Sequence, residues 1–184
     1  MKTKKITTMA VLICLCLTLP SFAADSITVR SFSIPQHGKL MLNIPSSWKQ
    51  GTGDPVEIFP TIILSPAKGD AFEVLITPIW NTKNDPNFNK SEKVKSMIYN
   101  DLREMLPSAI EKDVNIREFK GAYGNGYYFL LTDKAPKPGE YTYATRAWVG
   151  VGDLLLSVTI LSRSRDSEGI TSTIMALKEA KQTK

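Results

Sequence analysis

The residues that could carry out a reaction are few in this chain. His37 is the only histidine among 184 residues, so a Ser-His-Asp or Cys-His arrangement would have to use it. It lies in a Pro-Gln-His-Gly segment, which is typical of a surface turn, and there we expect an exposed polar residue. The Gly-x-Ser-x-Gly sequence of many serine hydrolases does not occur. The sequence therefore does not favour catalysis through a histidine-activated nucleophile.

Serine and lysine provide a second candidate chemistry. The spacing Ser-x-x-Lys occurs twice, as Ser46 with Lys49 and as Ser65 with Lys68. On a helix this spacing lets the lysine amine accept the proton of the serine. Both pairs lie in turn-like stretches, and the companion Ser-Asp-Asn and Lys-Thr-Gly motifs of penicillin-recognising enzymes are missing from the sequence. We therefore interpret both pairs as chance matches in surface turns.

Paired carboxylates could serve a glycosidase, which uses two such groups on either side of the scissile bond. Asp101 and Glu104 lie three residues apart in a predicted helix and so share a face. That face is opposite the apolar stripe containing Ile98 and Leu102, and we expect it to be solvated. The pattern indicates a polar helix surface rather than a catalytic pair.

The sequence predicts no metal site and no cofactor. Cys14 and Cys16 both lie in the N-terminal apolar run, which leaves a single histidine for a zinc site. The asparagine-rich segment 81–89 offers oxygen atoms for calcium, but it has one carboxylate and lacks the EF-hand spacing. The glycine-containing loops lack the phosphate-binding fingerprints of nucleotide sites.

Aromatic residues near predicted loops and strand ends are the strongest indication of a recognition surface. Arg146 and Trp148 share a face of one predicted strand, and aromatic residues with arginine are common at binding surfaces. Trp80 and Tyr123 lie at the ends of other predicted elements. We predict that Arg146, Trp148, Trp80 and Tyr123 bind a partner. Burial in the core is the alternative for Arg146 and Trp148, because a large aromatic side chain is usually mostly buried.

The first 23 residues have the pattern of a cleaved signal peptide. Lys2, Lys4 and Lys5 precede an apolar run, and Ser21 and Ala23 occupy the small positions that a signal peptidase needs. The apolar run is shorter than the roughly 20 residues that span a bilayer, and no small residue precedes either cysteine as a lipid anchor requires. We predict cleavage after Ala23 and a periplasmic or secreted protein.

The mature chain would then keep 161 residues, which is 184 minus 23, as one domain over residues 24–184. Removal of three lysines leaves 20 basic and 18 acidic residues, a net charge of +2. This balance does not favour nucleic-acid binding, which needs lysine and arginine clustered on one face. Since no later apolar stretch is long enough to span a membrane, we predict a soluble mature protein.

The elements that would position these residues are organised around the segment 140–162. Two runs with aromatic and β-branched residues at alternate positions flank a glycine turn, which is the pattern of an antiparallel hairpin. In the second run Leu154, Leu156, Val158 and Ile160 share one face. We predict that this hairpin lies at the centre of the sheet.

Similar patterns predict two helices and further strands. An amphipathic helix of about five turns begins after a capping-box pattern at Asn89 and is broken near Pro107, and a second helix is capped by Asp166 or Ser167. The continuous apolar run at 127–131 favours a strand covered on both faces. We predict an α+β domain in which helices flank both faces of one antiparallel β-sheet. The other predicted strands cover residues 27–34, 39–44, 57–64, 71–79, 114–120 and 126–132.

The order of these elements resembles that of a known superfamily. The segment 44–49, Ile-Pro-Ser-Ser-Trp-Lys, follows an early strand, a long helix divides two groups of strands, and the segment 154–162 precedes a terminal helix. In these features the chain resembles the PsbP-like α/β/α sandwich superfamily, which includes the photosystem extrinsic protein PsbP and the bacterial DcrB-type proteins. The resemblance implies an accessory or partner-binding role without a shared catalytic motif. The chain lacks the lipid-attachment signal common in DcrB-type proteins.

We hypothesise a secreted or periplasmic accessory protein that binds an envelope protein partner and has no enzymatic activity. A carrier of a small hydrophobic ligand and a small hydrolase using Ser/Lys or carboxylates are the alternatives. A well-filled core with an exposed aromatic patch would favour partner binding, and a large apolar cavity would favour the carrier. A polar cleft that holds a Ser–Lys hydrogen bond would favour the hydrolase.

Overall fold

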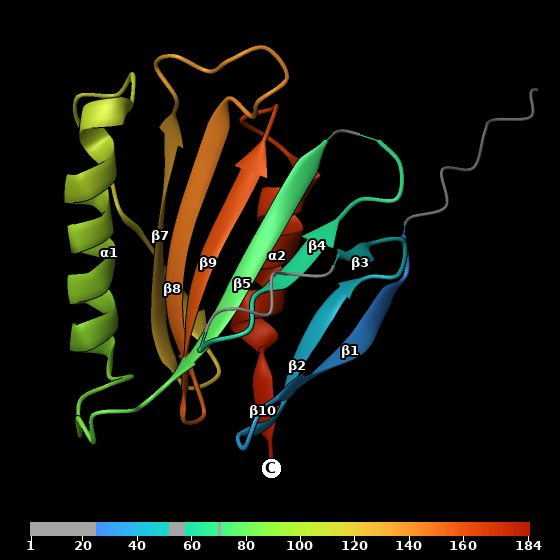
Figure 1. Cartoon of the computed structure of the whole chain (residues 1–184), viewed down its shortest axis with the longest axis vertical. Helices are drawn as coiled ribbons and strands as arrows, with labels where there is room; N and C mark the ends of the chain where they lie inside the picture. The colour runs from blue at the N-terminus through green and yellow to red at the C-terminus, as the bar shows by residue number, and fades with distance from the viewer. Residues whose placement is uncertain (1–24, 52–57, 70) are drawn as a thin grey trace, which may run out of the picture.

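The computed structural model describes residues 25–51, 58–69 and 71–184. In this part of the chain two antiparallel sheets and two α-helices form an α+β fold (Figure 1). The predicted signal peptide and the first residue of the strand predicted at 57–64 lie outside the described residues, and the signal peptide stays a prediction.

Seven strands form the larger sheet, and the predicted hairpin lies in its middle. Its two strands pair over their whole length, from Tyr143 opposite Ser162 to Val151 opposite Leu154. Apolar side chains occupy alternate positions in both strands, and this register places them on the same faces of the sheet. The placement of this hairpin is confirmed. In spatial order the strands are β3 (Lys49–Gly51), β4 (Ile62–Ser65), β5 (Phe72–Trp80), β9 (Leu154–Ser162), β8 (Tyr143–Val151), β7 (Gly124–Thr132) and β6 (Arg117–Gly121).

Three further strands form a separate, smaller sheet, so the prediction of one sheet is wrong. The order is β1 (Ile27–Ile34), β2 (Gly38–Pro45) and β10 (Lys181–Thr183), with β10 paired to β2. The sequence Lys-Gln-Thr of β10 has no apolar alternation, and the strand was therefore not predicted. The side chain of Gln182 fixes it in place, since its amide donates to the His37 carbonyl at 2.8 Å.

Two strand starts differ from the prediction. The strand predicted from residue 57 begins only at Ile62, and Pro60 lies in the irregular segment 58–61 before it, where its missing amide proton cannot support a ladder. The strand predicted from Val114 begins at Arg117. The short strand β3 was not predicted, because its three residues are all exposed and show no apolar alternation.

The first helix, α1 (Ser91–Met105), carries the predicted apolar stripe, with Val94 and Ile98 buried. Its 15 residues make about four turns rather than five. A 3-10 turn, η1 (Leu106–Ser108), follows directly and contains Pro107, which matches the predicted break.

The start of α1 differs from the predicted cap at Asn89. The N-cap residue is Lys90, and it makes no side-chain cap hydrogen bond. The Asn89 side chain instead donates to the Gly152 carbonyl at 2.6 Å, which ties the start of α1 to the turn between β8 and β9. Gly150 permits this close approach, because a Cβ at that position would lie 2.7 Å from the Asn89 carbonyl oxygen.

The second helix, α2 (Glu168–Glu179), begins after Ser167, one of the two predicted caps. The Ser167 hydroxyl accepts a hydrogen bond from the Gly169 amide at 3.2 Å. Ile174, Ala176 and Leu177 are buried along this helix. Within the described residues, neither helix is long and apolar enough to cross a membrane.

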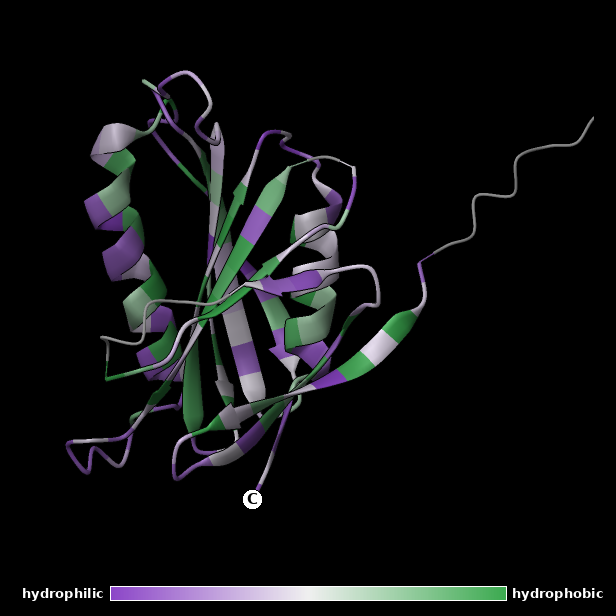
Figure 2. Cartoon of the chain, turned by 45° about the vertical axis from the view of Figure 1, so that its right-hand side comes forward, coloured by the Kyte–Doolittle hydropathy of each residue, from purple (hydrophilic) through white to green (hydrophobic). Residues whose placement is uncertain are grey.

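The buried side chains form two clusters, which we name after their helices. The α1 cluster joins Val94 and Ile98 to Leu155 of β9, whereas the α2 cluster joins Leu177 to Leu156 of the same strand. Neighbouring residues of β9 therefore enter different clusters. In Figure 2 the central strands are mostly coloured as hydrophobic, and both helices carry hydrophobic and hydrophilic residues.

Strand β7 is less covered than its apolar sequence predicts. Tyr127, Phe129 and Leu131 are buried in the α1 cluster, but Tyr128 and Leu130 remain partly exposed. This strand is therefore covered fully on one face and only in part on the other. The exposed parts of Tyr128 and Leu130 border a cleft that is described below.

Candidate functional site

Two of the predicted partner-binding residues lie under α1 in one polar network. The Asp101 carboxylate accepts hydrogen bonds from Arg146 Nε at 2.5 Å and from Trp148 Nε1 at 2.7 Å. Arg146 also donates to the Thr159 hydroxyl at 2.6 Å, and its guanidinium lies 5.2 Å from the centre of the Trp148 ring. The prediction that Asp101 shares a solvated face with Glu104 is therefore wrong, because Asp101 is turned toward the sheet.

This network accounts for the charge of Arg146 inside the fold. The side chains of Asp101 and Arg146 are each 20% exposed, and Trp148 is 5% exposed. The predicted pair thus shares a face as expected, but these contacts favour the alternative of burial in the core. Partner binding through Arg146 and Trp148 stays a prediction.

The other two predicted residues lie on different elements. Trp80, at the end of β5, packs against the α2 cluster and stacks with His37 at 4.9 Å between ring centres. The His37 Nδ1 atom lies 3.7 Å from Asp153, and only a quarter of the side chain is exposed, so His37 is less exposed than predicted. Tyr123 is half exposed in the turn between β6 and β7.

The Ser-x-x-Lys pairs do not form a catalytic arrangement in the described residues. The Ser46 hydroxyl forms a hydrogen bond with the Ser26 hydroxyl at 2.9 Å and donates one to the Asp25 carboxylate at 3.0 Å. The register of β3 and β4 places Lys49 opposite Ser65, but no hydrogen bond joins their side chains. The pairs are therefore parts of strands and turns at the surface.

The asparagine-rich segment also uses its polar atoms within the chain. The Asn81 side-chain oxygen accepts from the amides of Lys83 and Asp85, at 3.2 Å and 3.0 Å. This is the pattern of an Asx turn, and it occupies an oxygen that a calcium ion would need. In the described residues, no three His, Cys, Asp or Glu side chains gather as a metal site would require.

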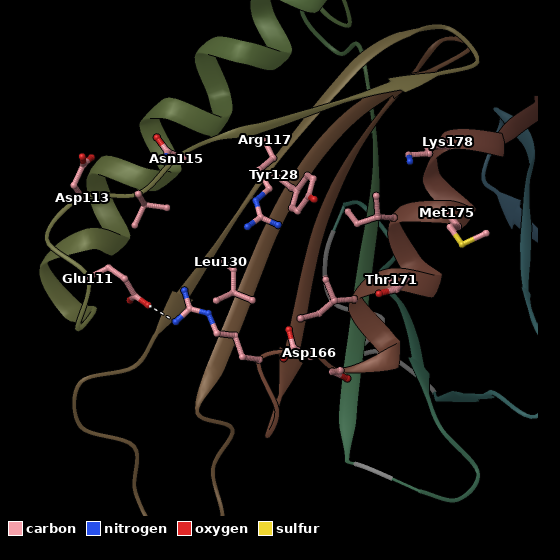
Figure 3. A pocket seen from close by; sticks show the side chains of 15 residues that line it. Glu111, Asp113, Asn115, Arg117, Tyr128, Leu130, Asp166, Thr171, Met175 and Lys178 are labelled. Carbon is pink, nitrogen blue, oxygen red and sulfur yellow. Dashed lines mark hydrogen bonds and ion pairs between the residues drawn. The ribbon is translucent and has the colours of Figure 1, made fainter.

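A cleft opens beside α2 because this helix crosses the sheet obliquely. Near its start a Cβ at Gly169 would lie 2.6 Å from the Phe72 ring of β5, and near its end a Cβ at Gly121 of β6 would lie 3.9 Å from the Leu177 carbonyl. The first half of α2 therefore diverges from β6 and β7. The space between them has a volume of about 560 Å³ (Figure 3).

The lining of this cleft combines an apolar floor with charged sides. Tyr128 and Leu130 form the floor on β7, and Ile170 and Ile174 face them from α2. Basic and acidic side chains surround this floor, and eight of the fifteen lining residues are exposed. The charged lining residues are Arg117, Arg165 and Lys178 with Glu111, Asp113 and Asp166.

One acid and one base of the cleft neutralise each other. The Glu111 carboxylate accepts hydrogen bonds from the Thr132 amide at 2.8 Å and hydroxyl at 2.7 Å, and Arg165 lies 3.5 Å away. Burial raises the pKa of Glu111, but the hydrogen bonds from Thr132 and the charge of Arg165 outweigh it and leave the pKa below 4.5. The Glu111 carboxylate is therefore ionised at neutral pH, and both of its oxygens accept hydrogen bonds.

The other two basic side chains of the cleft have no such partner. The guanidinium of Arg117 lies 5.9 Å from the centre of the Tyr128 ring, and Figure 3 places Lys178 across the cleft on α2. Within the described residues, neither Arg117 nor Lys178 lies within ion-pair distance of a carboxylate. Of the three basic side chains that line the cleft, Arg117 and Lys178 are therefore the two that an anionic group of a ligand could pair with.

The comparisons with known proteins bear on the fold. The solution structure of cyanobacterial PsbP (CyanoP) from Synechocystis sp. PCC 6803 matches over 90% of this chain and 98% of its own, with a TM-score of 0.50. The fold is PsbP-like. The two sequences are only 10% identical, so the likeness extends to the PsbP-like fold alone. No family model and no curated protein matches this chain.

The cleft was missed in the sequence, although its PsbP-like setting was expected. Tyr128 and Leu130 belong to an apolar run that indicated burial, and Arg117 was an ordinary charged residue of a predicted strand. The cleft arises from the angle of α2 across the sheet. The spacing of residues along the chain does not predict the angle at which a helix crosses a sheet.

Proposed function

We propose that this chain is a non-enzymatic accessory protein that binds an envelope protein partner through the cleft beside α2. The observation that carries the proposal is an open cleft in which Arg117 and Lys178 lie near an apolar floor, without a carboxylate partner among the residues that the structure describes. An apolar centre with a polar, exposed rim is the usual anatomy of a protein interface. An accessory role is also what the resemblance to the PsbP-like superfamily implies.

The state of the ionisable groups supports a binding role over a catalytic one. Asp101 is engaged with Arg146 and Trp148, and Glu111 is engaged with Thr132 and Arg165. A general base needs a free proton acceptor beside the reacting group, and a general acid needs a proton that it can donate there. Both oxygens of Glu111 accept hydrogen bonds from Thr132, and Oδ2 of Asp101 accepts two, so each carboxylate has a structural role in this arrangement.

The helices of this protein flank both faces of the larger sheet, in the manner of an α/β/α sandwich. Side chains of neighbouring residues in a strand point to opposite faces. Leu155 packs with α1 and Leu156 packs with α2, which supports one helix on each face. The floor of the cleft on β7 would then lie on the face that α2 covers.

Affinity capture from the solubilised native envelope tests the binding proposal. The double variant Arg117→Ala/Lys178→Ala removes both unpaired cations, and Lys95→Ala/Arg103→Ala removes the same charges from the exposed side of α1 as a matched control. We expect the control to recover the same partner as the wild type, and the cleft variant to recover about tenfold less. Equal recovery by all three proteins would remove the cleft from consideration.

Export of the protein is a separate part of the proposal, because it rests on residues 1–23. We expect the protein in the periplasmic fraction or the medium, with a mature chain that begins at Ala24. Cell fractionation locates the protein, and amino-terminal sequencing of the fractionated protein identifies its first residue. A full-length chain in the cytoplasmic fraction would contradict export.

A further inference from the structure

The chemistry of the cleft narrows the class of partner. We infer that the cleft takes a peptide segment with one carboxylate flanked by apolar side chains, the carboxylate lying between Arg117 and Lys178. This inference rests on the proposed function, because it names the part of a protein partner that the cleft would recognise.

The charge of the segment follows from the two unpaired cations. Arg165 is already neutralised by Glu111 at 3.5 Å, which leaves Arg117 and Lys178 as the cations available to an occupant. Stacking of Arg117 near Tyr128 holds its guanidinium at the floor, and a guanidinium binds a carboxylate through two parallel hydrogen bonds.

The same lining limits the segment to a single carboxylate. Asp113 and Asp166 are exposed on the rim of the cleft. They would repel a run of acidic residues, because like charges at short range are unfavourable. A single acidic residue avoids that repulsion and still meets both cations.

The apolar part of the segment follows from the floor. Tyr128, Leu130 and Ile170 are each partly exposed around the cleft, and Met175 on its rim is 58% exposed. Covering these exposed apolar side chains with other apolar groups removes them from water and is favourable. Leucine and phenylalanine side chains beside the carboxylate would provide that cover.

A peptide fits the openness of this site better than a free small molecule does. Sites for small molecules usually bury most of the ligand surface, whereas more than half of the lining residues here are exposed. The cleft also borders β6, the last strand of the larger sheet, whose outer edge has no strand partner in the described residues. An extended peptide can reach such an edge with its backbone.

Titration of the purified protein with defined probes tests the inference. The probe is an acetylated, amidated hexapeptide with one glutamate between leucine and phenylalanine, and the matched control peptide carries glutamine instead. Decanoate and inorganic phosphate are further arms that present a carboxylate or an anion without a peptide. Chemical shifts of the amides of Tyr128, Leu130 and Ile170 report binding in the cleft.

We expect the glutamate peptide to bind at least about tenfold more tightly than the glutamine peptide. The variants Arg117→Ala and Lys178→Ala should each reduce that preference, and Lys95→Ala on α1 should leave it unchanged. Unchanged shifts of the α1 amides in each variant would show that the fold is retained. Equal affinity for both peptides, or cleft shifts with decanoate or phosphate but not with the peptide, would overturn the inference.

The peptide titration and the capture experiment can fail independently, so the inference and the proposed function are tested separately. If neither peptide binds while capture from the envelope still depends on Arg117 and Lys178, the proposed function stands and this assignment of the segment is wrong. If capture does not depend on these residues, the proposed function itself fails.

Discussion

The two helices are held to the larger sheet in different ways. Beneath α1, the Asp101 carboxylate receives Arg146 and the Trp148 indole in directed hydrogen bonds. Beneath α2 the contacts are apolar, and the hydroxyl of Thr173 is buried without a hydrogen-bond partner in the described residues. Hydrogen bonds fix the position and angle of a helix, whereas apolar contacts are not directional.

The difference shows where this fold leaves part of the larger sheet uncovered. The charges of Asp101 and Arg146 pair with each other beneath α1, and α1 lies close along β7 and β8. α2 crosses the sheet obliquely, and the part of β7 that it leaves uncovered carries Tyr128 and Leu130. The predictions below test whether the two sides differ in this way.

The largest expected effect is the loss of an aliphatic anchor of α2. Leu177→Ala should lower the free energy of unfolding by about 4 kcal/mol, because the side chain is 1% exposed and its removal leaves a cavity. Met175→Ala on the exposed side of the same helix is the control and should change it by about 0.5 kcal/mol or less. Urea unfolding measures both. Similar losses for the two variants would show that α2 is not anchored by its buried contacts.

The second effect concerns the network beneath α1. Asp101→Ala should lower the free energy of unfolding by about 3 kcal/mol, near the lower end for a broken buried ion pair, since the pair is one-fifth exposed. Glu104→Ala, on the exposed side of α1, should cost about 0.5 kcal/mol or less. If both variants unfold at the same urea concentration, the polar network does not hold α1 and the contrast between the helices disappears.

A third and smaller effect depends on pH at the edge of the cleft. The folded pKa of Glu111 lies below its ordinary value of 4.5, so its stabilising contribution is complete above that pH and is lost as the pH falls through the folded pKa. Glu111→Gln should therefore cost about 2 kcal/mol at pH 7 and progressively less below pH 4.5. Unfolding curves across this range measure the difference. A constant difference would contradict an ionised Glu111.

The smallest effect is expected in the cleft itself. Arg117→Ala/Lys178→Ala should change the free energy of unfolding by no more than about 0.5 kcal/mol, because both side chains are exposed and unpaired. Thermal unfolding of the variant beside the wild type measures this. A loss above about 2 kcal/mol would show that the cations support the fold, and the contrast with Arg146 would be lost.

The sequence predicted the parts of the fold that depend on local patterns. The hairpin of β8 and β9 and the stripe of Val94 and Ile98 arise from alternation and helical spacing within single segments. The resemblance to the PsbP-like superfamily also rested on the order of such segments. These features do not require knowledge of distant partners.

The errors concern contacts between distant segments. Asp101 was assigned to a solvated face because Arg146, its partner, lies 45 residues further along the chain. The smaller sheet was missed because β10 has no pattern of its own and becomes a strand only beside β2. The cleft depends on the angle of α2, so its residues could not be selected from the sequence.

The pairing of β10 with β2 has a consequence for how the chain is made. The bond from Gln182 to the His37 carbonyl joins residues 145 positions apart. During synthesis on the ribosome, β1 and β2 emerge long before β10, and the edge of β2 that pairs with β10 stays open until β10 has appeared. Contacts of such long range form slowly, and an open strand edge can associate with other chains. The early hairpin is therefore the segment that a folding chaperone would have most reason to cover.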